Sequence, residues 1–121
     1  MKNSETASQC NVKKERLACA ISRVLTEERV PAERNGYRYL AYAIESAYMN
    51  REMAGAVFKE LYPAVARAFS TSPQAVERAM RTAIARAREI RDDAEIRKRT
   101  NSEFIFQAVE QVKICLDKKE L

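Results

Sequence analysis

The chain has 121 residues, of which 46% are hydrophobic and 32% charged, with only two glycines, three prolines and a formal net charge of +5. This length suits a single domain with a hydrophobic core, and the composition favours helices over strands. No apolar run approaches the roughly 20 residues of a membrane-spanning helix and the first residues lack the apolar segment of a signal peptide, so we predict a cytoplasmic protein without membrane contact.

The N-terminal part is predicted to form a leader and two helices. Residues 1–12 are polar and show no period, which is typical of a disordered leader. The helical domain is therefore expected to span residues 13–121. Its first helix, over 13–29, has an apolar stripe formed by Leu17, Ile21, Val24 and Leu25. Val30-Pro31 ends it, and a second helix is expected over 37–50.

The middle of the chain predicts two short segments and a turn. A helical segment is expected over 51–61, and Pro63 is expected to begin a new short helix, because proline is tolerated in a first helical turn. A kinked continuous helix is the alternative. The turn 70–72 follows. Ser72 before Pro73 is a strong helix start, although Thr71 with Gln74 is a second capping option.

Two longer helices complete the chain. One is expected over 73–90, and the last begins at Thr100, since threonine followed three residues later by Glu103 predicts a capping box. The fold class is therefore all-α: a compact domain of five to six helices that contains a helix-turn-helix.

The helix over 73–90 has two different faces. At 100° per residue, one side collects six apolar residues: Val76, Met80, Ala83, Ile84, Ala87 and Ile90. The opposite side carries Gln74, Arg78, Arg81, Ala85 and Arg88, flanked by Glu77 and Thr82. Arginine can pair with guanine, glutamine with adenine and glutamate with cytosine. Because such helices read bases with their first half, we predict base contacts from Gln74, Glu77, Arg78 and Arg81.

Charge and helix starts suggest phosphate contacts around this face. Residues 78–99 contain eight basic and four acidic side chains, which raises affinity for polyanions, although a solvated face with intrahelical ion pairs would have the same composition. Arg88 lies farther along the helix and is assigned to phosphate. The helix starts at Ser72 and at 100–102 present free backbone amides, which also suit phosphate.

The residue types give little support for catalysis. There is no histidine, no Cys-x-x-Cys motif, no glycine-rich phosphate loop and no nucleophile motif. Cys19 and Cys115 fall in apolar patterns and are predicted to be core residues. We therefore predict no enzyme activity, no catalytic residue, no metal and no cofactor.

Three sequence blocks identify a known family: NGYRYLAYAIE at 35–45, LYPAVARAFSTSPQAVERAMRTAI at 61–84 and TNSEFI at 100–105. They strongly resemble the DNA-binding effector domain of the sporulation stage-zero A response regulator. The resemblance implies a helical transcription regulator that binds double-stranded DNA at short boxes, often in tandem, where a homodimer could form. It implies that Glu77, Arg78 and Arg81 read bases. It also places Thr82 near the DNA backbone and Thr100, Asn101 and Ser102 near phosphates or a neighbouring subunit.

Two departures from the family pattern favour an alternative function. Full-length members carry a receiver domain, for which this chain has no room, and the segment 85–99 is shorter than in the sporulation regulators. That segment is associated with subunit contact and RNA polymerase engagement. The alternative is therefore a receiver-less interaction module that modulates a full-length homologous regulator or RNA polymerase. Binding to a structured RNA also stays open.

Overall fold

The structure, a computed structural model, describes residues 2–50, 56–91 and 99–120, and all the regular secondary structure of these residues is helical. In chain order the elements are α1 (Lys2–Glu27), α2 (Asn35–Met49), the π-helical turn η1 (Val57–Leu61), α4 (Tyr62–Ala68), α5 (Pro73–Arg91) and α6 (Asn101–Glu120). The predicted all-α class is confirmed.

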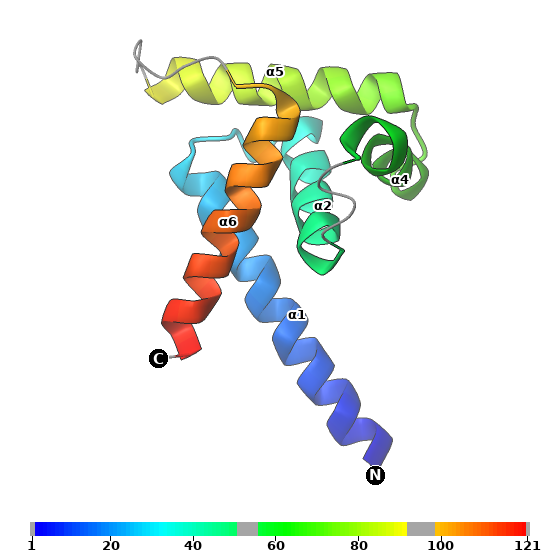
Figure 1. Ribbon diagram of the computed structural model, residues 1–121, viewed down its shortest axis with the longest axis vertical. Coiled ribbons are helices and arrows are strands. Elements are labelled where there is room, and N and C mark those ends of the chain that lie inside the picture. Colours follow the sequence, from blue (N-terminus) through cyan, green and yellow to red (C-terminus); the bar gives the residue numbers. More distant parts are fainter. Residues whose placement is uncertain (1, 51–55, 92–98, 121) are drawn as a thin grey trace.

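The helices are arranged as a group of three beneath a crossing helix. Figure 1 shows α1, α2 and α6 running downward from α5, which lies across their upper ends, with α4 beside the first turns of α5. The helices α1 and α6 lie side by side, and α2 contacts both α5 and α6. This arrangement leaves one long side of α5 facing away from the rest of the domain.

The first helix begins earlier than the sequence predicted. The helix α1 starts at Lys2, whereas the sequence predicted a helix start at Lys13. No glycine or proline occurs between these two positions, so nothing in the chain interrupts helical hydrogen bonding there. Its other end forms a Schellman motif: Arg29 adopts a φ of 67°, and the Val30 N–H donates to the Leu25 carbonyl at 3.0 Å.

Pro63 lies within continuous helical backbone. The π turn Val57–Leu61 leads directly into α4, and Leu61 has αR dihedral angles. A new α-helix nevertheless begins at Tyr62 with Pro63 in its first turn, so the predicted short helix at this proline is confirmed. The wider turn is a reasonable response to proline, which lacks an N–H and crowds the carbonyl four residues before it.

The core collects one face from each α-helix. The largest fully buried side chains include Leu25, Leu40, Ile44, Leu61, Met80 and Phe104. Cys115 packs against this core from a partly buried position, but Cys19 is exposed, contrary to prediction. The buried stripe of α1 falls at Leu17, Ala20 and Ile21, and Cys19 lies between these positions on the opposite side of the helix.

Gly36 brings α2 into close contact with α5. A Cβ atom at Gly36 would lie 2.6 Å from the Ala83 Cβ and would also collide with the carbonyl oxygen of Ala79. Because no described glycine has a positive φ, glycine is required here for space rather than for backbone conformation. The start of α2 therefore determines how closely α5 approaches the rest of the domain.

Candidate nucleic-acid interface

The turn between α4 and α5 orients the start of α5. Ser70 adopts a φ of 54°, and the Thr71 N–H donates to the Ala66 carbonyl at 2.9 Å, which closes α4. The hydroxyl oxygen of Ser72 accepts a hydrogen bond from the Ala75 N–H at 3.1 Å. Ser72 is thus the N-cap, as predicted, and Pro73 occupies the first helical position. The hydroxyl hydrogen of Ser72 takes no part in the capping bond.

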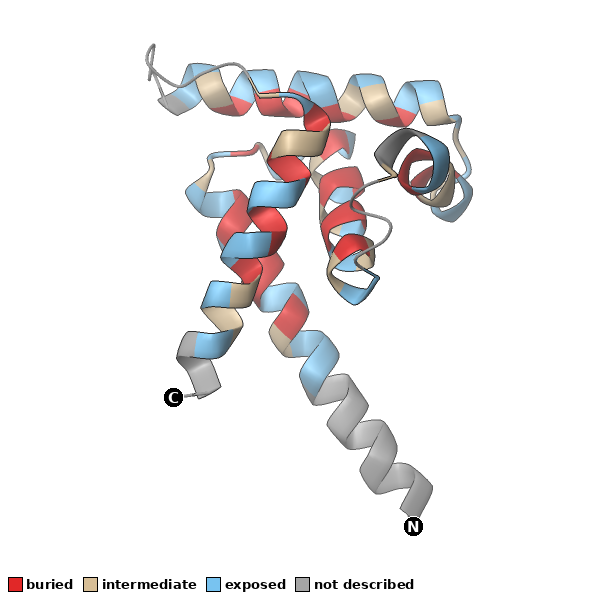
Figure 2. Ribbon diagram, in the orientation of Figure 1, coloured by how far each residue is buried: buried red, intermediate tan, exposed pale blue. Residues whose placement is uncertain are grey.

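The two predicted faces of α5 are separated as expected, with one exception. Val76, Met80, Ala83, Ile84 and Ala87 are buried, whereas Ile90 is 54% exposed because it lies near the end of α5, beyond the core. In Figure 2 the buried residues follow the lower side of α5 and the exposed ones its upper side. The exposed residues on this outer face include Gln74, Arg78, Arg81, Thr82 and Ala85.

Glu77 and Arg81 form an ion pair at the edge of the outer face. Arg81 Nη1 lies 3.3 Å from Glu77 Oε1, while the Arg81 side chain remains 65% exposed. The pair is an i, i+4 contact on one helix. The pair orients the Arg81 guanidinium and leaves it on the surface. A guanidinium has five N–H donors, so donors remain for a ligand. Arg78 is exposed one residue after Glu77, so both arginines that were predicted to read bases lie on open surface.

The second half of α5 also carries an intrahelical ion pair. Arg86 pairs with Glu89 at 3.3 Å, as expected for a solvated helix face. Arg88 is partly buried, so only part of its side chain is available to a ligand. Arg86 remains 54% exposed, so its guanidinium, like that of Arg81, stays on the surface.

The start of α6 confirms the predicted capping box. The Glu103 N–H donates to the Thr100 hydroxyl oxygen at 3.1 Å, and the Thr100 N–H lies 3.5 Å from Glu103 Oε1. Thr100 is exposed and Ser102 partly buried. Figure 1 places this start directly below α5, so the helix end that was predicted to contact phosphate lies beside the candidate reading helix.

Asn101 has an internal role that the sequence did not reveal. Its side chain is 8% exposed, and Nδ2 donates to the Tyr62 hydroxyl at 2.9 Å and to the Glu77 carbonyl at 3.1 Å. The side-chain amide thus joins α6 to α4 and to the backbone of α5, while the predicted phosphate contact of this helix start, through its backbone amides, stays a prediction. A capping motif identifies a helix start, but it cannot identify tertiary partners distant in sequence.

Arg99 is also used inside the domain. Its guanidinium pairs with Glu28 at 3.1 Å, donates to Gln107 Oε1 at 2.7 Å and lies 4.9 Å from the centre of the Phe104 ring. Arg99 is one of the eight basic residues of the segment 78–99, yet its charge ties the start of α6 to the end of α1. The number of cations in that segment therefore overstates the charge available to a polyanion.

Tyr62 makes stability sensitive to alkaline pH. Burial raises the pKa of its phenol above 10.0, and the Glu77 carboxylate adds to this effect, while the Asn101 hydrogen bond and Arg81 oppose it. The neutral phenol is favoured in the folded state, so its contribution to stability is complete below about pH 10 and is lost as the pH rises through the folded pKa.

We expect the free energy of unfolding of the Tyr62→Phe variant to depend less steeply on pH than that of the wild type between about pH 9.5 and 11. Denaturant titrations at several pH values would measure this difference. Tyr42→Phe is the matched control because Tyr42 is 37% exposed. Equal slopes for wild type and Tyr62→Phe would show that the buried phenol does not control alkaline stability.

The geometry defines a class of protein: an all-helical domain whose helix-turn-helix, α4 and α5, presents a polar and basic face on its second helix. Among the described residues, no helix has the length and apolar content to span a bilayer. Nor do three His, Cys, Asp or Glu side chains of that part of the chain gather where they could hold a metal ion.

Comparison with known families gives the same class. The chain belongs to the family described as the C-terminal domain of the sporulation initiation factor Spo0A, and the match spans residues 21–112. This family is a helical DNA-binding domain of a sporulation regulator. The resemblance inferred from the three sequence blocks is thereby confirmed.

Proposed function

We propose that the protein binds double-stranded DNA sequence-specifically, with the outer face of α5 in the major groove, and that it regulates transcription in this way. The observation that carries the proposal is the open, common face formed by Gln74, Arg78 and Arg81 directly after a capped turn. A helix of this kind reaches base edges with its N-terminal half while the preceding helix crosses the backbone.

Each residue of the face has a distinct role in this proposal. Arg78 and Arg81 donate paired hydrogen bonds to guanine, Gln74 pairs with adenine, and Glu77 accepts from cytosine while orienting Arg81. We assign phosphate contacts to Ser72, Thr82 and Arg88 and to the helix start formed by Thr100, Asn101 and Ser102. These contacts determine how the helix sits in the groove, whereas base contacts determine sequence preference.

Selection of bound duplexes from a random pool, followed by a salt titration, tests whether binding is specific. A recovered motif that is bound much more tightly than scrambled duplex at the same salt concentration supports specific reading. Equal affinity for both duplexes, with a steep loss of binding as the salt concentration rises, would show that the protein binds DNA only as a polyanion and reads no sequence.

We expect Arg78→Ala to weaken binding to the selected duplex by about 1–3 kcal/mol and to relax the preference at one base pair. Fluorescence anisotropy at constant salt would measure both effects. Arg23→Ala is the matched control, because Arg23 is an exposed arginine on α1 that pairs with Glu27. If the two variants bind with the same affinity and sequence preference, Arg78 does not read a base.

A further inference from the structure

A groove lies at the end of the domain opposite α5. It has a volume of about 370 Å³, and its walls come from α1, the last turn of α2 and the last turns of α6. In Figure 1 these segments are the lower ends of α2 and α6 and the middle of α1, while α5 crosses the upper ends of the three helices. A ligand in this groove would therefore leave the outer face of α5 open.

The floor of the groove is apolar and includes an unusually exposed methionine. Leu17, Tyr48, Met49 and Leu116 line it. Leu17 is almost fully buried, whereas Met49 is 71% exposed. A flexible, exposed methionine beside aromatic and leucine side chains is common on surfaces that bind apolar segments of a partner, because its thioether chain adapts to different shapes.

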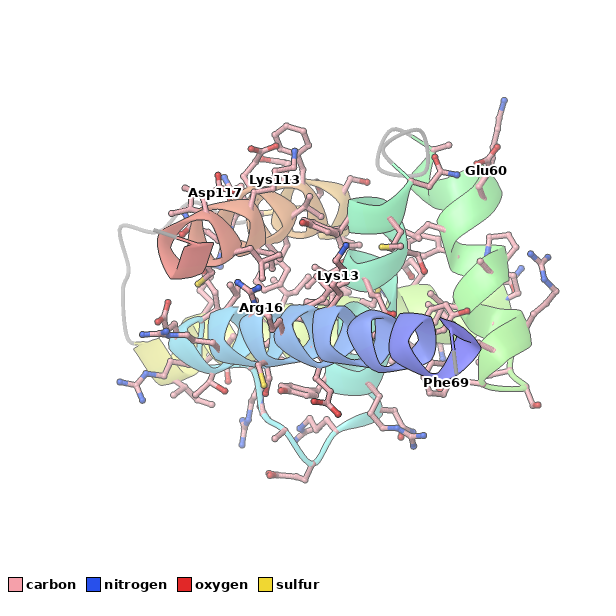
Figure 3. The ribbon with its side chains drawn as sticks, turned by 90° about the horizontal axis from the view of Figure 1, so that it is seen from below. Lys13, Arg16, Glu60, Phe69, Lys113 and Asp117 are labelled. Atoms are coloured by element: carbon pink, nitrogen blue, oxygen red, sulfur yellow. The ribbon has the colours of Figure 1, made fainter. Side chains whose placement is uncertain are left out.

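The rim of the groove is mainly basic. Lys13, Lys14 and Arg16 on α1 contribute three positive charges, and Asp117 on α6 contributes one negative charge. Figure 3 shows Lys13 and Arg16 on the side of α1 that is turned toward α6, where Asp117 lies. The lysines are exposed, so they are free to meet a ligand. An occupant that complements this site has an apolar stripe flanked by carboxylates.

We infer that the groove binds an acidic amphipathic helix of a partner protein. The apolar side chains of that helix, at spacings of three and four residues, enter between α1, α2 and α6, and its Glu and Asp side chains meet Lys13, Lys14 and Arg16. This is the helix-in-groove mode of peptide recognition. Because the groove and α5 lie at opposite ends of the domain, the partner and DNA bind to the same molecule together. The inference does not depend on what α5 reads.

The test uses the full chain and a synthetic 16-residue helical peptide with leucines at positions i, i+3, i+4 and i+7 and glutamates between them. We expect binding in the micromolar range by fluorescence anisotropy, and shifts of the Met49 and Leu116 methyl signals in NMR spectra. A peptide with lysines in place of the glutamates is expected to bind at least tenfold more weakly, because it would repel the rim.

Charge reversal on the rim provides the decisive variant. Lys13→Glu combined with Lys14→Glu is expected to raise the dissociation constant for the acidic peptide at least tenfold and to leave binding of the selected duplex within twofold. Lys59→Glu is the control, because Lys59 is an exposed lysine on η1, outside the groove. A parallel change in duplex binding would show that the rim is a DNA-binding surface.

Three other results would overturn the inference. They are no peptide binding at millimolar concentration, equal binding of the acidic and basic peptides, or methyl shifts confined to residues outside the groove. Tighter association with vesicles of anionic phospholipid than with the peptide would show that the groove and its rim contact a membrane surface instead. The Arg78→Ala variant separates the two proposals, because it is expected to weaken duplex binding and to leave peptide binding unchanged. Its effect on duplex binding bears only on the proposed function.

Discussion

Replacing Gly36 with alanine is expected to lower the free energy of unfolding by about 1–3 kcal/mol, as overpacking of a well-filled contact generally does. The added methyl group would collide with the backbone of α5 at Ala79 and with the Ala83 side chain. Neither of these neighbours can rotate away, so the helices must separate. The better helix propensity of alanine offsets only part of this cost, about 1 kcal/mol.

Denaturant unfolding of Gly36→Ala and Gly36→Val measures the effect, and the valine variant is expected to lose more because its side chain is larger. Asn35→Ala serves as the control, since Asn35 is the exposed residue immediately before Gly36. A Gly36→Ala variant as stable as the wild type would mean that α5 can move outward without loss of packing.

Replacing Asn101 with alanine is expected to cost about 1–3 kcal/mol of stability, because buried hydrogen bonds to Tyr62 and Glu77 are removed together. The bonds link three helices, so their loss weakens the attachment of α6 to α4 and α5. Thermal or chemical unfolding would measure this change. Ser102→Ala is the matched control, because Ser102 is the next residue and is only partly buried.

A double-mutant cycle with Tyr62→Phe separates the Asn101–Tyr62 bond from other effects of each substitution. We expect a coupling free energy of about 0.5–3 kcal/mol between the two positions, as residues in contact generally show. Additive losses from Asn101→Ala and Tyr62→Phe would mean that the bond between these side chains contributes nothing to stability.

Local sequence signals predicted those parts of the fold that depend on neighbouring residues. The N-cap at Ser72, the capping box at Thr100 and the end of the first helix before Pro31 are each encoded within a few positions, and the structure contains all three. The two faces of α5 followed from helical periodicity, which also brought Arg78 and Arg81 to one exposed side.

Tertiary contacts could not be predicted in the same way. Asn101 and Arg99 resemble ordinary polar residues at a helix start, and their partners Tyr62 and Glu28 are distant in sequence. The groove at the opposite end of the domain joins α1, α2 and α6 and has no signature within any one of them. The exposure of Cys19, in contrast, could have been predicted from the spacing of Leu17 and Ile21 alone.

The division of α5 into two faces has a consequence for how such domains can diversify. Its buried residues, Val76, Met80 and Ala83, hold the helix in place, while Gln74 and Ala85 on the other side are exposed. Exchanges of exposed side chains away from caps and ion pairs generally alter stability by less than about 0.5 kcal/mol. The scaffold can therefore tolerate new residues at these positions, so the outer face of α5 can change its chemistry without first being stabilised.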